Sequence, residues 1–203
     1  MDLIVGVGYK LEQAIKDAST DYPEQQFALI DAVCEGEQPE NVTSLLYEDN
    51  ASSYLTGLIA GKMTETNKVG FIGGMETDVI AKFDYGFRAG VKAANPDAEV
   101  MVQYANSFTD SALGKTIANQ MHSNNVDIIF TCAGAVGIGA IEAAKENGKK
   151  AIGVDQDQNS LAPDNIITSA MKRVDVGMFL HVHNYCKKSE KCPFHRQKTV
   201  SSY

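Results

Sequence analysis

Short runs of apolar, largely β-branched residues alternate with longer amphipathic segments from the start of the chain to about residue 178. Each short run has the length of a strand and ends in a turn rich in Gly, Asp or Asn, whereas each longer segment repeats its apolar residues with a helical period. This alternation predicts an α/β fold of parallel strands with crossover helices. The predicted strands are residues 3–8, 26–32, 42–47, 68–73, 99–105, 126–132, 150–154 and 165–170. Eight strands are many for one small open sheet.

The helices are predicted from apolar residues that share one face. A polar residue near Asp110 is placed to cap one of them, and Asn95-Pro96 is placed to end another. We interpret the apolar stripes as core and not as a cofactor site. The stripes are Leu11, Ile15 and Ala18; Val79, Phe83, Phe87 and Val91; and Leu113, Ile117 and Met121.

The organisation into lobes is predicted from one polar stretch. Residues 64–67 are entirely polar and separate a helix at 52–63 from the strand at 68. We therefore expect residues 1–66 to form the rest of an amino-terminal lobe, 67–160 a carboxyl-terminal lobe and 161–178 a hinge or crossover segment. Residues 179–203 are basic, rich in His and Cys and without a helical stripe, so we expect a divergent, disordered tail.

Composition and charge narrow the class of protein. The 203 residues are 44% apolar and 22% charged, which is typical of a globular protein. No run approaches the ~18 apolar residues that a membrane span needs, and the acidic start has no signal peptide character. The net charge is −8; residues 179–203 carry five Lys or Arg and one Glu, a sum of +4, which leaves −12 for residues 1–178. Such an acidic body repels phosphate backbones, so nucleic acid is not the expected partner.

Candidate binding residues lie where the predicted strands end, because ligands of parallel α/β sheets bind at the carboxyl ends of the strands. These ends supply carboxylates at Asp31 and Asp155 and glycines at Gly73-Gly74 and Gly134. Carboxylates accept from sugar hydroxyls, glycine lets a ligand approach the backbone, and Tyr9 or Phe108 could stack on a base. The mixture favours a hydroxyl-rich, partly aromatic small molecule.

Two features of these strand ends leave alternatives open. The glycines between Gly134 and Gly139, with Asp155 21 residues after Gly134, could form a dinucleotide-binding turn, although their order is not G-x-G-x-x-G. The same glycines could instead serve only tight helix packing. Asp155 and Asp157 alternate along a strand, so at most one faces a given cleft. Lys172 could donate to a hydroxyl or be a surface lysine.

Catalytic and metal-binding motifs are missing from residues 1–178, which favours binding over turnover. We interpret His122, at a polar helix end, as solvated, and Cys34 and Cys132 as buried free thiols. A zinc site or a Cys186–Cys192 disulfide can be drawn in the tail, but the spacing fits no zinc pattern. We predict no catalytic residue, no metal and no cofactor.

Several motifs, in order over residues 2 to about 177, together resemble the basic membrane protein family of nucleoside-binding lipoproteins. The resemblance implies a type I periplasmic-binding fold of two Rossmann-like lobes joined by crossing strands. It also implies an extracytoplasmic solute-binding protein of an ABC importer, anchored as a lipoprotein in full-length members. The motifs are residues 27–31, 53–60, 68–75, 108–110, 132–134, 151–158 and 168–172.

The resemblance also implies a site for a purine nucleoside between the two lobes. Asp31 would hold the base and Asp155 the ribose, while the backbone of Gly134 and the side chain of Lys172 would add ribose contacts. Met75 would edge the cleft, and the candidate stacking aromatics are Tyr9, Phe108 and Phe130. The expected partners are the nucleoside and a membrane permease, and we expect a monomer.

The chain departs from the family pattern at both ends. The first family strand and its ligand-binding loop would precede Met1, and the sequence after Gly177 diverges from the expected helix and returning strands. We therefore expect a fragment whose amino-terminal lobe lacks its first strand, with no lipoprotein signal in this chain. Two other functions stay open: an NAD-type dinucleotide-binding enzyme, and a ligand-sensing regulator of the same fold.

Overall fold

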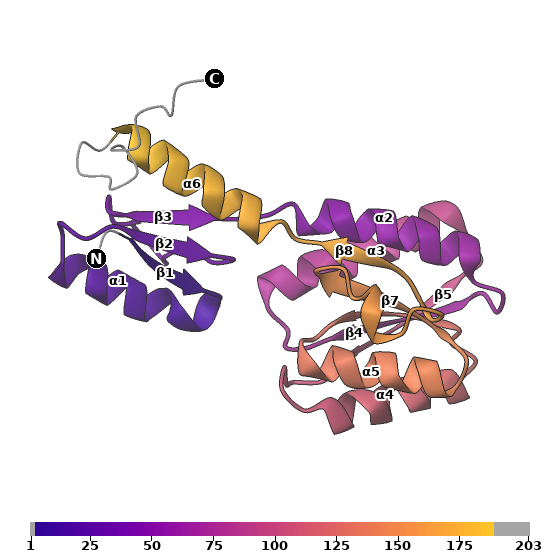
Figure 1. The fold of residues 1–203 in the computed structure, drawn as a ribbon. Helices are drawn as coiled ribbons and strands as arrows, with labels where there is room; N and C mark the ends of the chain where they lie inside the picture. The colour runs from indigo at the N-terminus through magenta and orange to yellow at the C-terminus, as the bar shows by residue number, and fades with distance from the viewer. Residues whose placement is uncertain (1–2, 189–203) are drawn as a thin grey trace, which may run out of the picture. The chain divides into compact units, whose positions relative to one another are not determined.

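The computed structural model describes residues 3–188, in which eight strands form two separate parallel sheets. A three-stranded sheet has the order β1-β2-β3, and a five-stranded sheet has the order β5-β4-β6-β7-β8 (Figure 1). The predicted alternation of strands and helices is thus confirmed, and the eight strands divide between two sheets. Their bounds are β1 Ile4–Val7, β2 Phe27–Ile30, β3 Val42–Leu45, β4 Lys68–Gly73, β5 Glu99–Tyr104, β6 Ile128–Cys132, β7 Lys150–Asp155 and β8 Ile166–Met171.

The helices begin and end largely where the sequence signals them. Thr77 caps one helix by accepting from the Ile80 N–H, and Asp110 caps another by accepting from the Leu113 N–H. The helices are α1 Glu12–Asp21, α2 Asp49–Met63, α3 Asp78–Ala94, α4 Ser111–Ser123, α5 Ala135–Glu146 and α6 Val174–Lys188, with short 3₁₀ turns η1 Tyr9–Leu11 and η2 Asn159–Leu161.

The chain folds as two compact units. Unit 1 comprises Met1–Tyr47 and Arg173–Tyr203, and unit 2 comprises Glu48–Lys172. Unit 1 therefore contains the three-stranded sheet, α1 and α6, whereas unit 2 contains the five-stranded sheet and α2 to α5.

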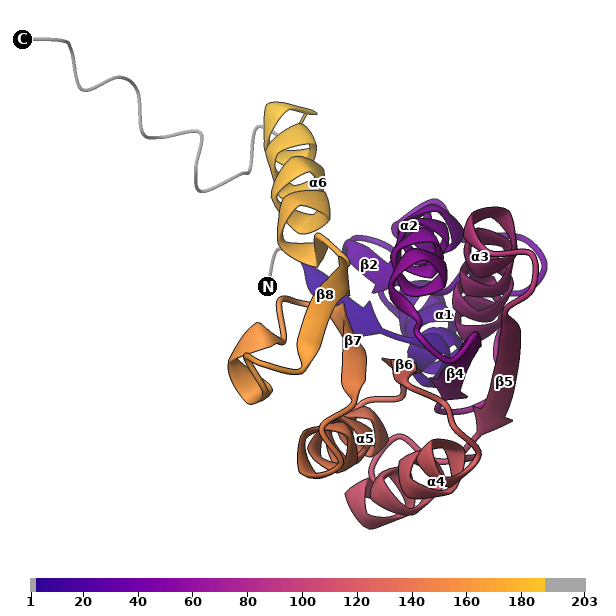
Figure 2. The ribbon, with the colours of Figure 1, turned by 90° about the vertical axis from the view of Figure 1, so that its right-hand side faces the viewer.

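Unit 2 is a three-layer sandwich. Figures 1 and 2 place α2 and α3 on one face of its sheet and α4 and α5 on the other. Alternate residues of β4 serve the two faces: Phe71 packs with the α3 residues Phe83 and Phe87, whereas Ile72 packs with Met121 of α4. Both faces of the sheet are therefore covered, as expected for a parallel sheet.

Helices α2 and α3 pack with their backbones in close contact, and this contact decides where the units divide. A Cβ added at Gly57 would collide with the Phe87 carbonyl oxygen, and one added at Gly90 would collide with that of Tyr54. Because α2 lies against α3 in this way, it belongs to unit 2. The units divide between Tyr47 and Glu48 and again between Lys172 and Arg173, not at the polar stretch 64–67.

Unit 1 has a smaller core around its central strand. All four residues of β2 are buried, and its apolar cluster includes Ile15 from α1 and Val42 from β3. Within the described residues β1 pairs with β2 alone, and Val7 of β1 is 61% exposed.

Helix α6 corrects one expectation about the tail. Residues 174–188 are helical, and the rings of Phe179 and His183 stack at 5.9 Å between centroids. These two residues are one helical turn apart, a spacing that supports a helix even without a regular apolar stripe. The prediction of a disordered tail was therefore wrong for residues 179–188, and its remainder, 189–203, lies outside the described residues.

A second correction concerns His122. This residue is 8% exposed, and its Nδ1 lies 3.0 Å from the Val126 carbonyl oxygen, so it is not the solvated side chain expected from a polar helix end. The chain turns back after α4 to enter β6, and this turn covers the imidazole. Burial lowers its pKa from the ordinary value.

Candidate functional site

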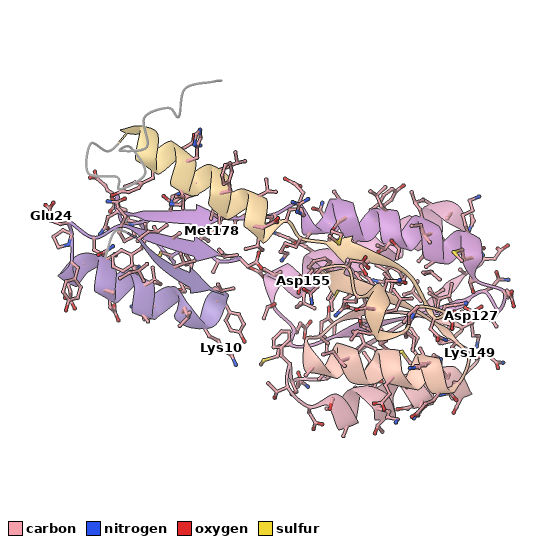
Figure 3. The ribbon with its side chains drawn as sticks, in the orientation of Figure 1. Lys10, Glu24, Asp127, Lys149, Asp155 and Met178 are labelled. Atoms are coloured by element: carbon pink, nitrogen blue, oxygen red, sulfur yellow. The ribbon has the colours of Figure 1, made fainter. Side chains whose placement is uncertain are left out.

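The carboxyl end of the five-stranded sheet brings together five of the six predicted site residues. Phe108 follows β5, Met75 follows β4, Gly134 follows β6, Asp155 ends β7 and Lys172 follows β8. Because all five strands are parallel, these residues lie along one edge of the sheet. Figure 3 shows Asp155 at this end of unit 2, with Asp127 and Lys149 at the opposite end.

The sixth residue, Asp31, lies in unit 1. It follows β2, and its N–H donates to the Leu45 carbonyl oxygen at 3.0 Å. It shares with Asp155 a left-handed backbone conformation, with φ of 61° and 66° respectively. This conformation is uncommon for residues other than glycine and is enriched at functional sites.

Phe108 is held against two glycines. A Cβ added at Gly74 would collide with the Phe108 ring, and one added at Gly134 would lie 2.8 Å from the Phe108 carbonyl oxygen. That same oxygen accepts from the Ala135 N–H at 2.8 Å, and Gly134 has a positive φ of 58°. A side chain at either position would need Phe108 to move: the ring of Phe108 packs on the end of β4, and its backbone is bonded to the turn after β6.

Asp155 and Lys172 are linked through the backbone. The Lys172 N–H donates to the Asp155 carbonyl oxygen at 2.8 Å, which continues the β7 to β8 pairing by one step. Asp155 as a residue is exposed, and its backbone is constrained in the left-handed conformation.

Lys172 is not a surface lysine. Its Nζ lies 3.1 Å from Oδ1 of Asp49, and the two side chains are only 6% and 4% exposed. The ammonium also lies 5.2 Å from the centroid of the Phe83 ring. The sequence indicated Lys172 but not Asp49, which stands in the polar run Glu48-Asp49-Asn50 without any motif.

Burial also determines the protonation state of Cys132, a thiol near Asp49 and Lys172. Cys132 is fully buried at the end of β6, and this burial, reinforced by the Asp155 carboxylate, raises the pKa of its thiol well above the ordinary value. Cys132 is accordingly a protonated, free thiol, as is expected of an unreactive buried cysteine. Cys34 is likewise buried and free.

A second polar cluster lies between α3 and β5. Asp84, 5% exposed, receives a hydrogen bond from the Tyr104 hydroxyl at 3.2 Å and pairs with Nε of Arg88 at 2.9 Å. Burial raises the pKa of Asp84, and burial together with Asp84 raises the pKa of Tyr104 to about 12. Tyr104 is therefore neutral near pH 7.

The glycines after β6 serve helix packing. Cβ atoms added at Gly114 and Gly139 would collide with the carbonyl oxygens of Val136 and Ser111, so α4 and α5 touch through their backbones. Gly137 faces Thr131 of the preceding strand. This use of the glycines supports the packing alternative over the dinucleotide-binding turn.

Two further candidates lie elsewhere. Phe130 is fully buried and packs on Phe71, Phe83 and Phe87 at 5.2 to 6.1 Å between ring centroids, so it is a core residue and not a stacking aromatic. Asp157 accepts from the Asn159 N–H and lines a groove of about 390 Å³ beside β8, which Asp155 does not line. This separation agrees with the expectation that only one of the two acids faces a given cleft.

Between residues 3 and 188, no three His, Cys, Asp or Glu side chains are grouped so that they could hold a metal ion. None of the helices in that range combines the length and apolar character of a membrane span.

Comparison with known proteins places the chain in a family. A model described as ABC transporter substrate-binding protein PnrA-like matches residues 1–194. Basic membrane protein A of Borreliella afzelii is 43% identical over 189 residues, which cover 92% of this chain and 58% of the relative. The chain thus spans little more than half the length of this relative.

Solved structures agree on the architecture. An ABC transporter solute-binding protein from Aeropyrum pernix has a TM-score of 0.85 at 32% identity, over 92% of this chain and 55% of its own. A transcriptional activator of the comK gene from Bacillus halodurans has a TM-score of 0.79 at 28% identity, over 93% of this chain and 64% of its own. The predicted α/β fold of the type I periplasmic-binding class is thereby confirmed, and the chain belongs to the PnrA-like family of ABC transporter substrate-binding proteins.

Proposed function

We propose that this chain takes part in binding a purine nucleoside and that the whole protein delivers it, outside the cytoplasm, to the permease of an ABC importer. Membership of a substrate-binding family supports the solute-binding part. The choice of ligand rests on one observation: the same sheet edge carries an exposed acidic residue, Asp155, and a fixed aromatic ring, Phe108. A sugar hydroxyl suits the first and a base suits the second.

Each strand end contributes one contact in this proposal. Asp155 accepts from the ribose hydroxyls, the Gly134 backbone lies close enough for direct approach, and Lys172 donates from its buried position. Phe108 stacks on the base, and Met75 lines the same edge. Asp31, in unit 1, is assigned to the base on the family resemblance alone.

A thermal-shift panel of nucleosides, free ribose and NADH tests the ligand. We expect ~1 mM inosine or guanosine to stabilise the protein, by about 2.7 kcal/mol where the concentration is 100 times the dissociation constant. Ribose and NADH should cause no shift. Stabilisation by NADH and not by nucleosides would instead support the dinucleotide-binding enzyme.

Asp155→Ala provides the variant for the same panel. We expect it to abolish the stabilisation by nucleosides and to lower the melting temperature without ligand only slightly, because the residue is exposed but alanine tolerates its left-handed φ of 66° less well than aspartate. Asp157→Ala is the matched control, since Asp157 lines the separate groove, and it should respond to nucleosides like the wild type. Equal responses of the two variants would remove Asp155 from the site.

A second candidate function is ligand sensing by a regulator. The similarity to the comK activator, at 28% identity over 93% of this chain, favours it specifically. Both functions predict nucleoside binding, so the location of the full-length protein separates them. Digestion by external protease in spheroplasts indicates the receptor, whereas protection until lysis indicates the regulator.

A further inference from the structure

The Asp49–Lys172 pair stands out as a buried ion pair at the edge of the candidate site. The two charged atoms are 3.1 Å apart, and both side chains are more than nine-tenths buried. Such a pair contributes little net stability over apolar residues of the same size, because both charges lose their hydration. Its placement at a strand end therefore needs a reason other than stability.

Three elements fix the position of the ammonium. The backbone of Lys172 is bonded to Asp155 at the end of β7, Asp49 lies in the first turn of α2, and Phe83 of α3 presents its ring. The helix N-terminus favours the ionised carboxylate of Asp49, because the helix dipole is positive there. A flexible lysine chain is thus held in one place by a counter-charge that is itself held by a helix.

We infer that Asp49 is a positioning residue, which holds the Lys172 ammonium at the strand end so that it can donate to a ligand bound at Asp155. This inference rests on the proposed function for its ligand, but the placement of Lys172 by Asp49 can be measured without any ligand. Asp49 acts through Lys172 and does not itself contact the ligand.

The ligand-free test is acetylation of lysines by acetic anhydride, read residue by residue by mass spectrometry. In the wild type Lys172 should react at least about tenfold more slowly than the exposed Lys145, because its side chain is only 6% exposed and the Asp49 carboxylate disfavours the neutral amine that reacts. In Asp49→Asn, Lys172 should approach the rate of Lys145, while Asp49→Glu should retain most of the protection. Unchanged protection of Lys172 in Asp49→Asn overturns the inference.

The binding test is a double-mutant cycle of Asp49→Asn and Lys172→Gln, with inosine and 2′,3′-dideoxyinosine as probes. We expect each single variant to weaken inosine binding by about tenfold or more and to reduce the preference for inosine over the dideoxy probe. The double variant should bind like Lys172→Gln alone, since Asp49 acts only through the lysine. Independent, additive losses overturn the inference.

Thiol labelling of Cys132 monitors whether unit 2 stays closed in these variants. If Asp49→Asn exposes Cys132, the test is whether Lys172→Gln and the double variant bind inosine equally, as the inference requires. Neither of these two variants leaves a buried cation without its counter-charge. If wild-type protein binds no nucleoside while the acetylation pattern holds, the proposed ligand is wrong and the positioning by Asp49 stands.

Discussion

Units 1 and 2 are built from the same repeat of parallel strand and helix, but they bury different kinds of side chain. The described core of unit 1 is one apolar cluster around β2, with Ser19 as its buried polar residue. Unit 2 has apolar layers on both faces of its sheet and also encloses Asp49, Asp84 and His122. The repeat therefore determines the architecture of both units, whereas buried carboxylates and a buried imidazole distinguish the unit that carries most of the candidate site.

The largest expected effect tests whether the two cores are independent. Phe130→Ala removes a ring that packs on three other phenylalanines and should lower the free energy of unfolding of unit 2 by about 3–5 kcal/mol. Cys132 and Cys34 are buried thiols in unit 2 and unit 1 respectively, so their labelling in increasing urea reports each unit separately. Cys132 should be labelled at lower urea, with the midpoint for Cys34 unchanged.

Leu55→Ala is the control for this experiment, because Leu55 is 60% exposed and lies in the same unit. It should change stability by no more than about 0.5 kcal/mol. Equal shifts of the urea midpoints of Cys34 and Cys132 labelling in Phe130→Ala would mean that the units unfold as one body. The two cores would then differ in composition but would not be independent in stability.

The next effect is the pH dependence of the stability of unit 2. Burial lowers the pKa of His122 below its ordinary value of 6.5. The unfolded chain therefore takes up a proton near pH 6.5 that the folded chain resists, so unit 2 loses stability as pH falls through 6.5 and levels off below the folded pKa. Each unit of pKa difference corresponds to about 1.4 kcal/mol.

His122→Gln should remove this part of the pH dependence, as measured by urea unfolding between pH 7.5 and pH 5 with Cys132 as the probe. His183→Gln, which changes a histidine of unit 1, should keep the wild-type dependence. A pH dependence that persists unchanged in His122→Gln would show that other groups of unit 2 cause it.

The smallest effect is that of the Tyr104 hydroxyl. Tyr104→Phe keeps the ring against Phe71 and removes the hydrogen bond to Asp84, which should cost about 1 kcal/mol at pH 7. In the wild type the pKa of Tyr104 is about 12, raised by burial and by Asp84, so stability falls between the ordinary value of 10.0 and 12 as the unfolded tyrosine ionises first.

Ultraviolet titration of tyrosinate is the measurement for Tyr104. The variant should lack the component that titrates near pH 12, and its stability should decline less steeply above pH 10. Loss of a component near pH 10 instead would place Tyr104 in contact with solvent.

Much of the fold could be predicted because local patterns and tertiary structure agree. The strand predicted at 68–73 is β4 itself, and α4 is capped by Asp110, one of three neighbouring polar residues that could have served. Parallel pairing places the carboxyl ends of all five strands of unit 2 at one edge of the sheet. The residues that follow these strands could therefore be grouped from the sequence: Met75, Phe108, Gly134, Asp155 and Lys172. Whether they bind a ligand stays a prediction.

The features that the sequence did not reveal depend on contacts between distant segments. Asp49 looks like any acid at a helix start, and only the return of β8 to α2 makes it the partner of Lys172. His122 looks solvated until the turn into β6 covers it. The boundary after Tyr47 likewise depends on the contact of α2 with α3, whereas the polar residues 64–67 suggested a boundary after α2.

The way in which Phe108 is held has a thermodynamic consequence. Its ring packs on Gly74 and against the buried apolar cluster of unit 2, which restricts its rotamers before a ligand arrives. Ordering a free side chain on association costs about 0.5–1.5 kcal/mol. If an aromatic ligand stacks on this ring, as proposed, it avoids much of that entropic penalty, and preorganisation of a single phenylalanine then strengthens affinity without adding any contact.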